Sequence, residues 1–345
     1  MEERSSLNIP LQRQALHAWH TFWHSPISPI PLGLLRILLV GYLGTTLPHR
    51  FLVYHWSLEI PKAFYAPGMV LERFLWPFPL TEGSFLFFSA LMHILVFMAG
   101  AGLFTRLSMT LFSVGYWYLA AIDSAWGWHD HGPSLVVQVL VVLSLSPGVN
   151  CLSLDQLLKH LRARSQSTRA SLFQPVPRWG FQLILVLLSL FYFTSGFSKL
   201  RYGGLEWMNG KTLQFYLEGK SNSRHMQQYG SSPEVPEGEK WKDGFGLQYY
   251  IYGANPSPLA KRIAESPLAC SMFAIGTIIF ELGFIIVLFG GTLRPLLLFG
   301  GLVFHASVYF LMHISFMPWM VIEFSYLAWE FFRHFQDKPV TKPCL

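Results

Sequence analysis

The chain has 345 residues, of which 52% are hydrophobic and 13% are charged, and its mean hydropathy is +0.37. Soluble domains carry roughly 25% charged residues, so this composition excludes an ordinary soluble protein. The formal net charge of +6 does not indicate a nucleic-acid partner, because the Lys and Arg residues gather in loops beside apolar segments. The three cysteines, Cys151, Cys270 and Cys344, are scattered, which argues against a disulfide framework.

The apolar segments predict an all-α integral membrane protein, a bundle of about eight transmembrane helices with an N-terminal amphipathic surface helix. In the interfacial segment 1–29, Leu11, Ala15 and Trp19 recur at helical spacing, and this pattern is typical of a helix on the membrane surface. The spans predicted within a membrane domain over 30–333 are 30–47, 83–104, 107–126, 134–149, 180–199, 268–289, 296–312 and 318–332.

Two further segments complete the predicted organisation. A long polar insertion, 200–266, separates two of the spans, and its portion 221–244 is expected to be an exposed loop. Residues 334–345 form a C-terminal tail. No internal repeat is evident, and the glycine pairs do not follow strands, so no nucleotide-binding loop is indicated.

The distribution of Lys and Arg predicts that both termini are cytoplasmic. With that orientation, twelve basic residues fall in the inner loops and tails and three fall in the outer loops, which agrees with the positive-inside rule. The insertion 200–266 exceeds ~60 residues, and its Lys and Arg residues are outside this count because the positive-inside rule does not hold for long loops. The orientation places the end of the span 180–199 and the turn at 126–133 on the extracytoplasmic side.

Polar residues from several spans are therefore expected at one membrane level. Lys199 ends its span on the outer side, His129 and His131 lie in the outer turn, Asp123 lies one to two helical turns below, and Trp319 falls nearby. A charge inside a bilayer is costly and tends to pair or to line a cavity. We interpret this group as a candidate proton-transfer site on the extracytoplasmic side.

Each candidate also has a simpler interpretation. Lys199 can snorkel to the headgroups, or it can be a buried amine that desolvation favours in its neutral, basic form. His129 and His131 lack a third and fourth ligand at defined spacing, so no metal is expected. Glu281 and His305 lie in mid-span and can simply hydrogen-bond each other or Arg36.

Four segments carry a resemblance to a known family. They are LGLLRILLVG at 32–41, WGWHDHGPSL at 126–135, FYFTSGFSKLRYGGLEWMNGKTL at 191–213, and the block 281–323 with its Arg-Pro turn, its Phe-His pair and a closing Phe-Met-Pro-Trp. In the same order, they resemble motifs of the horizontally transferred transmembrane (HTTM) domain. This domain is related to the membrane part of vitamin K-dependent gamma-carboxylase.

The resemblance implies a chemistry. The carboxylase oxidises vitamin K hydroquinone with O2, and the strong base that results removes a proton from a glutamate, to which CO2 then adds. The resemblance implies that Lys199 is the base, that His131 supports the oxygenated quinone and that His305 takes part in catalysis. Trp128, His129, Asp123 and Trp319 are the candidates for contacting the quinone.

We therefore expect a membrane enzyme that deprotonates and oxidises reduced vitamin K or another quinol, with a protein or small molecule as the carboxylation substrate and the bilayer as its environment. The alternative is a non-enzymatic quinone- or lipid-binding membrane module, or a subunit that docks a partner. A transporter is less favoured, because inverted repeats with broken helices are not evident.

Overall fold

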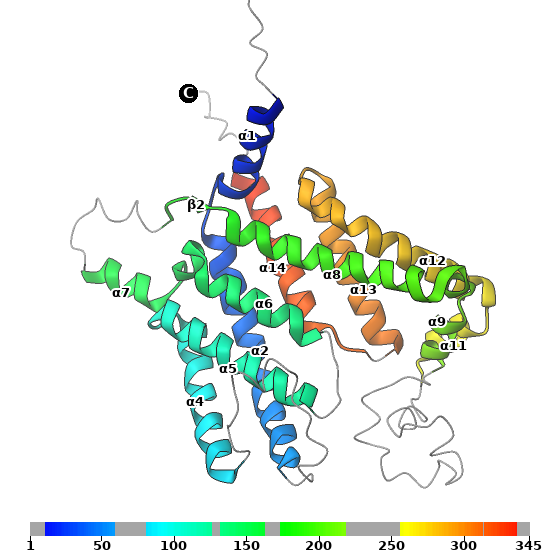
Figure 1. The fold of residues 1–345 in the computed structure, drawn as a ribbon, viewed down its shortest axis with the longest axis horizontal. Helices are drawn as coiled ribbons and strands as arrows, with labels where there is room; N and C mark the ends of the chain where they lie inside the picture. The colour runs from blue at the N-terminus through cyan, green and yellow to red at the C-terminus, as the bar shows by residue number, and fades with distance from the viewer. Residues whose placement is uncertain are drawn as a thin grey trace, which may run out of the picture. The chain divides into compact units, whose positions relative to one another are not determined.

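The computed structural model describes residues 11–58, 81–125, 132–162, 173–218, 256–312 and 314–336. The chain divides into two compact units, Met1–Leu187 and Leu188–Leu345. The helix α8, Trp179–Gly203, begins in the first unit and continues into the second. Figure 1 labels the elements along the chain, and each unit is described separately below.

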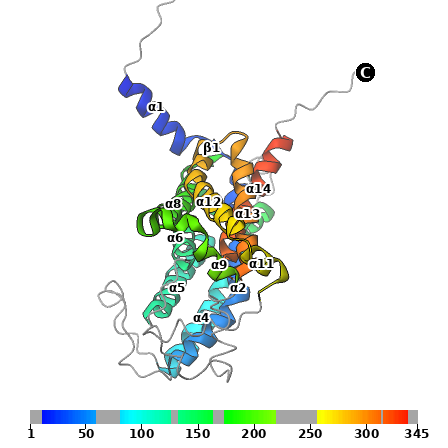
Figure 2. The ribbon, with the colours of Figure 1, turned by 90° about the vertical axis from the view of Figure 1, so that its right-hand side faces the viewer.

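The first unit is helical apart from one short strand pair. Its elements are α1 (Leu11–His24), β1 (Pro26–Ile27), α2 (Ile30–Ser57), α4 (Glu82–Ala101), α5 (Thr105–Ala125), α6 (Gly132–Leu145), the 3-10 helix η2 (Pro147–Asn150), α7 (Leu154–Arg162) and β2 (Val176–Pro177). The strands pair antiparallel, with Pro26 opposite Pro177. α2 packs against α4, α4 against α5, and α5 against α6. α1 stands apart from the helices that follow it (Figure 2).

Arg36 ties these helices together from inside α2. Its side chain is fully buried and donates hydrogen bonds only to backbone carbonyls, at distances from 2.6 to 3.3 Å. The acceptors are the carbonyl oxygens of Ala99, Gly100, Val149, Cys151 and Leu152. These carbonyls belong to the end of α4 and to the segment after α6, where an unpaired backbone group in an apolar layer would be costly. An arginine within a span is expected to face the interior, because it is too costly to face lipid, and Arg36 does so.

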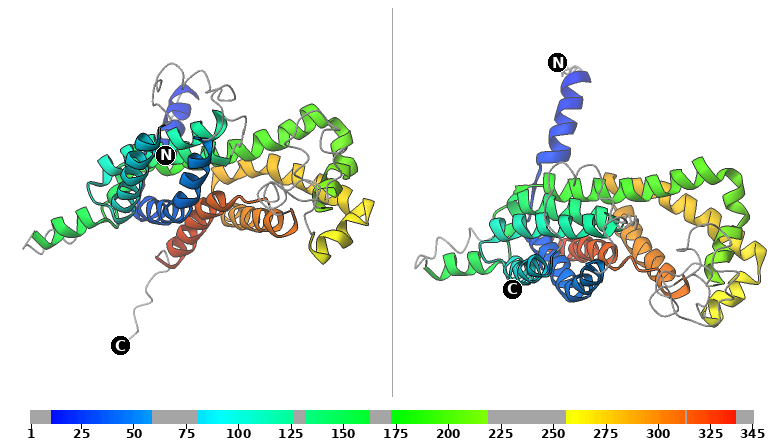
Figure 3. Two further views of the ribbon diagram at one scale, coloured as in Figure 1. Left: turned by 90° about the horizontal axis from the view of Figure 1, so that it is seen from below. Right: turned by 60° about the horizontal axis from the view of Figure 1, so that its bottom comes forward.

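The second unit contains the remaining helices. After α8 come the 3-10 helix η4 (Gly204–Asn209), α9 (Lys211–Leu217), α11 (Pro258–Ala264), α12 (Pro267–Gly283), the 3-10 helix η6 (Phe284–Phe289), α13 (Leu293–Met312) and α14 (Met317–Gln336). α12 packs against η4, α9 and α11, and α13 packs against α14. The adjacent orange and red ribbons of Figure 3 are α13 and α14.

Five of the described helices are long and apolar enough to cross a membrane. They cover Ile30–Leu52, Glu82–Ala101, Trp179–Asn209, Pro267–Phe289 and Leu293–Met312, and each coincides with a predicted span. The prediction of an all-α membrane protein is thus confirmed. The other three predicted spans contain α5, α14 and the shorter apolar α6. The total of about eight spans and the membrane-surface position of α1 stay predictions.

The long insertion differs from its prediction at both ends. Residues 200–217 are helical, in the end of α8, η4 and α9, and Pro258–Ala264 forms α11. Leu217, Ala260, Ala264 and Cys270 form a small buried cluster that joins these helices to α12. Polar composition concealed this packing, because only a few apolar residues carry it. The portion 221–244, predicted as an exposed loop, lies outside the described residues.

Candidate functional site

One face of α8 carries three of the polar side chains discussed below for the second unit. Tyr192, Ser195, Gly196 and Lys199 follow each other at helical intervals of three, four and seven residues, which places them on the same side of the helix. Gly196 lies against α12, where an added Cβ would come within 3.0 Å of the Cβ of Glu281. The glycine therefore permits the close approach that brings Ser195 and Lys199 to Glu281.

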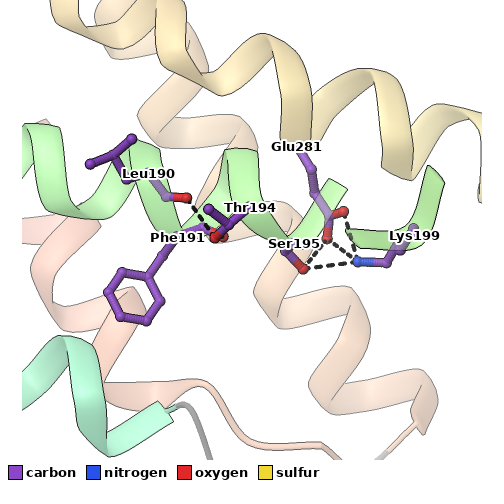
Figure 4. Close-up of polar contacts among 6 residues, drawn as sticks. All are labelled: Leu190, Phe191, Thr194, Ser195, Lys199 and Glu281. Atoms are coloured by element: carbon purple, nitrogen blue, oxygen red, sulfur yellow. Dashed lines mark hydrogen bonds and ion pairs between the residues drawn. The ribbon is translucent and has the colours of Figure 1, made fainter. Parts of the chain in front are cut away.

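Lys199 and Glu281 form an ion pair between α8 and α12. The Lys199 Nζ donates to both carboxylate oxygens of Glu281 at 2.7 Å and to the Ser195 Oγ at 2.9 Å. Ser195 also donates to Glu281 Oε1 at 3.3 Å (Figure 4). The side chain of Glu281 is 5% exposed and that of Lys199 is 22% exposed. The carboxylate is thus enclosed, whereas the lysine side chain is partly exposed.

The ammonium of Lys199 also lies over an aromatic ring. The indole of Trp207, in η4, has its centroid 5.4 Å from the Lys199 Nζ, a cation–π distance. Trp207 is half-buried. The ammonium, a hydroxyl, a carboxylate and a flat ring therefore occur together at the end of α8. A planar phenolic molecule could stack on such a ring and hydrogen-bond to the polar groups beside it.

A second polar cluster lies deeper in the same unit. Tyr192 donates from its hydroxyl to Glu323 Oε1 at 2.6 Å, and the Nδ1 of His305 lies 3.2 Å from the Tyr192 hydroxyl. The same nitrogen lies 3.3 Å from Glu323 Oε2. All three side chains are buried. Helices α8, α13 and α14 therefore contribute one residue each to a hydrogen-bonded group that can hold or exchange a proton.

Aromatic rings enclose this second cluster. Tyr192 stacks on Phe284 with centroids 4.0 Å apart, and Trp319 packs edge-on against His305 at 5.4 Å. Phe316 stacks on the other side of the imidazole at 5.0 Å. Such rings exclude water, so water does not compete for these hydrogen bonds. The electrostatic coupling among the polar groups is therefore stronger.

The structure brings together only some of the residues predicted for the site. His305 and Trp319 are in contact, and Lys199 is partly buried and paired instead of extending freely to the headgroups. Asp123 belongs to α5 in the first unit, and its side chain is not among those described. Trp128, His129 and His131 lie outside the described residues. In the part of the chain that the structure describes, no group of three His, Cys, Asp or Glu side chains is placed to hold a metal ion.

Several interactions differ from the simpler interpretations. Glu281 and His305 do not bond each other or Arg36; their partners are Lys199 and Glu323 respectively. His93, which lies in a predicted span, is exposed and bonds the Ser89 carbonyl within its own helix. Tyr192 and Glu323 were missed as site residues, because a tyrosine in an apolar run resembles ordinary packing. The signal that could have found Tyr192 is its spacing of seven residues before Lys199 on one helix face.

Comparison with known proteins gives one result. The model of the HTTM domain family matches residues 24–232, which is more than half of the chain. The match includes Arg36, Tyr192 and Lys199, whereas Glu281 and His305 lie beyond it. No curated protein and no solved structure matches the chain.

Proposed function

Since the chain belongs to the HTTM domain family, we propose that it is a membrane enzyme that deprotonates and oxidises a reduced lipid quinone, with Lys199 as the base. The observation that carries the proposal is the hydrogen-bonded ion pair of Lys199 with Glu281 inside two membrane-spanning helices. Ionisable residues within spans are rare and costly, and they usually mark a substrate or proton pathway.

The pair can accept a proton although an ammonium alone cannot. Lys199 first passes a proton to Glu281 along one of their 2.7 Å hydrogen bonds, which leaves a neutral amine facing the accessible side. The amine then takes the proton of the substrate hydroxyl. At the end of this step Glu281 carries the extra proton, and the charged Lys199 lies beside the negative oxygen of the substrate. Ser195 supports both states, since its hydroxyl can donate or accept.

The geometry also suits a substrate that arrives from lipid. Lys199 is the group at the accessible edge, and Trp207 offers a ring face next to it. When bound, a reduced quinone supplies the electrons that reduce O2. By resemblance to the carboxylase, the products are the quinone epoxide and water, and the strong base formed on the way can drive carboxylation of a second substrate. His131 and the proposed quinone contacts Trp128, His129 and Asp123 keep the roles that the resemblance implies.

The buried cluster of Tyr192, His305 and Glu323 is proposed as a proton reservoir behind the ion pair. Its members are hydrogen-bonded to each other, and Tyr192 lies on the same face of α8 as Ser195 and Lys199. A group that holds a proton close to a site of proton transfer can return it in a later step of the reaction. His305 therefore acts with Glu323 and Tyr192, and Trp319 fixes the plane of its ring.

The length of α8 supports the proposed side of the site once the termini are taken as cytoplasmic. Lys199 lies 20 residues after Trp179 in one continuous helix, which corresponds to about 30 Å and to the thickness of the hydrocarbon layer. With cytoplasmic termini, the basic segment before α8 is inside and Lys199 is at the extracytoplasmic side. The active side is therefore proposed to be extracytoplasmic.

Turnover of the purified protein tests the proposal. The protein is reconstituted in lipid nanodiscs with a 2-methyl-3-alkyl-naphthohydroquinone under O2, and the 2,3-epoxide is measured by chromatography and mass spectrometry. We expect epoxide from the wild type and a loss of at least about 100-fold in Lys199→Ala, the usual scale for removing a general base. Lys211→Ala is the matched control, because Lys211 is an exposed lysine at the start of α9. Equal turnover in wild type and Lys199→Ala would remove the assigned role.

The alternative is a quinone- or lipid-binding module without turnover. It is favoured by the structural role that the contact between Lys199 and Glu281 can have. The ion pair and the close approach at Gly196 join α8 to α12, as a purely structural tie would. In that case the guanidinium in Lys199→Arg still pairs with Glu281, and ligand binding and stability stay near the wild-type values. If Lys199 is the base, Lys199→Arg binds the quinol but turns over as poorly as Lys199→Ala, because an arginine does not release its proton.

A further inference from the structure

The short helix α7 has a leucine face that no part of the described chain covers. Its sequence, LDQLLKHLR, places leucines at intervals of three, four and seven residues, which is one side of a helix. These residues are Leu154, Leu157, Leu158 and Leu161, and they are 39%, 49%, 43% and 68% exposed. α7 projects from its unit in Figure 1 and in both views of Figure 3.

The start of α7 is fixed to the ends of the membrane-spanning helices. Asp155 accepts from the backbone of Phe104 at 3.0 Å and of Thr105 at 2.7 Å, at the beginning of α5. Its own N–H donates to the carbonyl of Gly102, just after α4, at 3.0 Å. Leu152 has a left-handed backbone, with φ of 56°, and its carbonyl accepts from Arg36 at 2.9 Å. The start of α7 is therefore held in place by hydrogen bonds to the neighbouring helix ends.

These anchors also set the depth of α7. Helix α4 ends at Ala101, α5 begins at Thr105, α6 ends at Leu145 and α2 begins at Ile30. The ends of apolar helices mark the boundary between hydrocarbon and headgroups. Because α7 starts at the level of these ends, its start is at the expected boundary between acyl chains and headgroups.

The remaining side of α7 is basic. Lys159 and Arg162 are exposed, and Asp155, the acidic residue of the helix, is engaged at the start of α5. The sequence that follows contains Arg164 and Arg169. A short helix with an apolar face and a cationic face binds the interface of a membrane, and each cation near the surface adds attraction to anionic lipids.

We propose that α7 lies in the headgroup layer of a leaflet that contains anionic phospholipid, with its leucine face in the acyl boundary and Lys159 and Arg162 against lipid phosphates. The charge of the polar side and the position at the ends of the spans favour a lipid surface over another protein as the occupant. This interaction is independent of the chemistry proposed at Lys199.

Site-directed spin labelling of the whole chain tests the position of α7. Leu158→Cys labels the leucine face and Lys159→Cys, one residue on, labels the polar side as the matched control. Cys151 and Cys270 are buried, and Cys344 is replaced by serine. In nanodiscs containing phosphatidylserine, the collision rates of each nitroxide with O2, which concentrates in lipid, and with a water-soluble nickel chelate are measured.

We expect the label at Leu158 to collide with O2 and to be shielded from nickel, and the label at Lys159 to show the reverse. Two outcomes overturn the proposal. Equal access of both labels to nickel means that α7 lies in water, and shielding of the Leu158 label from both reagents means that another protein or a second copy covers the leucines.

The lipid dependence tests the anionic component separately. In nanodiscs of phosphatidylcholine alone, the nickel accessibility of the Leu158 label is expected to rise at least twofold relative to nanodiscs with phosphatidylserine. The variant Lys159→Gln/Arg162→Gln should remove most of this difference, because the cations that attract the phosphates are gone. The same accessibility in both lipids would overturn the role of Lys159 and Arg162.

Discussion

Breaking the pair of Lys199 and Glu281 from its two sides should have unequal effects on stability. In Lys199→Met, the carboxylate of Glu281, which is 5% exposed, keeps only the hydroxyl of Ser195 as a partner. In Glu281→Gln, the ammonium of Lys199 is 22% exposed and can turn toward the edge of the unit, while the amide oxygen still accepts a hydrogen bond. Lys199→Met thus leaves an enclosed carboxylate without its cation, whereas Glu281→Gln leaves a partly exposed ammonium without its anion.

The expected magnitudes follow from this asymmetry. Removing one partner of a buried ion pair costs about 3–5 kcal/mol when the other charge stays enclosed, and we expect a value of about 3 kcal/mol for Lys199→Met. Glu281→Gln should cost about 1.5 kcal/mol, the lower end of the range for the loss of one charged hydrogen bond. The double variant Lys199→Met/Glu281→Gln should cost less than the sum of the two, because no charge remains buried.

Unfolding in mixed micelles measures these values. The free energy of unfolding is obtained from a titration with sodium dodecyl sulfate followed by tryptophan fluorescence, with Lys211→Met as a control expected to lie within about 0.5 kcal/mol of the wild type. The reasoning is refuted if Glu281→Gln costs as much as Lys199→Met, or if the double variant equals the sum of the single variants.

Three further predictions concern Arg36, Asp155 and the buried cluster of Tyr192, His305 and Glu323. Arg36→Met removes the donor that five backbone carbonyls share and should cost about 3 kcal/mol or more in the same titration, since each buried acceptor left unpaired costs about 1–3 kcal/mol; a cost below about 1 kcal/mol would contradict this role of Arg36. Burial acts to raise the pKa of Asp155, but the hydrogen bonds from Thr105 and Phe104 and the charge of Lys159 outweigh it and hold that pKa below its ordinary value. This stabilisation is present above about pH 4 and is lost as the pH falls through the folded-state pKa, so Asp155→Asn should lower the melting temperature at pH 7 and have little effect at the acid end; a pH-independent difference would argue against it. Tyr192→Phe removes one hydrogen bond to Glu323 and should cost about 1–2 kcal/mol and slow epoxide formation; unchanged values of both would exclude the cluster from the mechanism.

Hydrophobic patterning was enough to find the helices that cross the membrane. Each of the five helices that are long and apolar enough to cross a membrane overlaps a predicted span, since length and hydropathy together define a membrane helix. The starts agree within three residues, whereas the helices Ile30–Leu52 and Trp179–Asn209 run five and ten residues beyond the predicted ends. The interior position of Arg36 was equally predictable, because an arginine in a span is too costly to face lipid. Its acceptors were not predictable, since they are carbonyls 63 to 116 residues away that only the fold assembles.

Part of the candidate site was predictable as single residues, but Tyr192, Glu323 and the pairing of the residues were not. Lys199, Glu281 and His305 each stood out as ionisable groups in apolar segments. Which of them would pair depends on the crossing of α8 and α12 at Gly196, and sequence spacing carries no information about a contact 82 residues apart. The short helices η4, α9 and α11 were missed for another reason, because their few buried residues are diluted by polar ones.

The central claim is that Glu281, through Lys199, takes the proton of a reduced quinone. The most direct measurement is the rate of epoxide formation by Glu281→Gln in nanodiscs, beside Glu265→Gln, in which an exposed glutamate of the same unit is changed. The account predicts that Glu281→Gln still binds the naphthohydroquinone but forms epoxide at least about 100-fold more slowly, whereas Glu265→Gln matches the wild type. Wild-type epoxide formation by Glu281→Gln would contradict it.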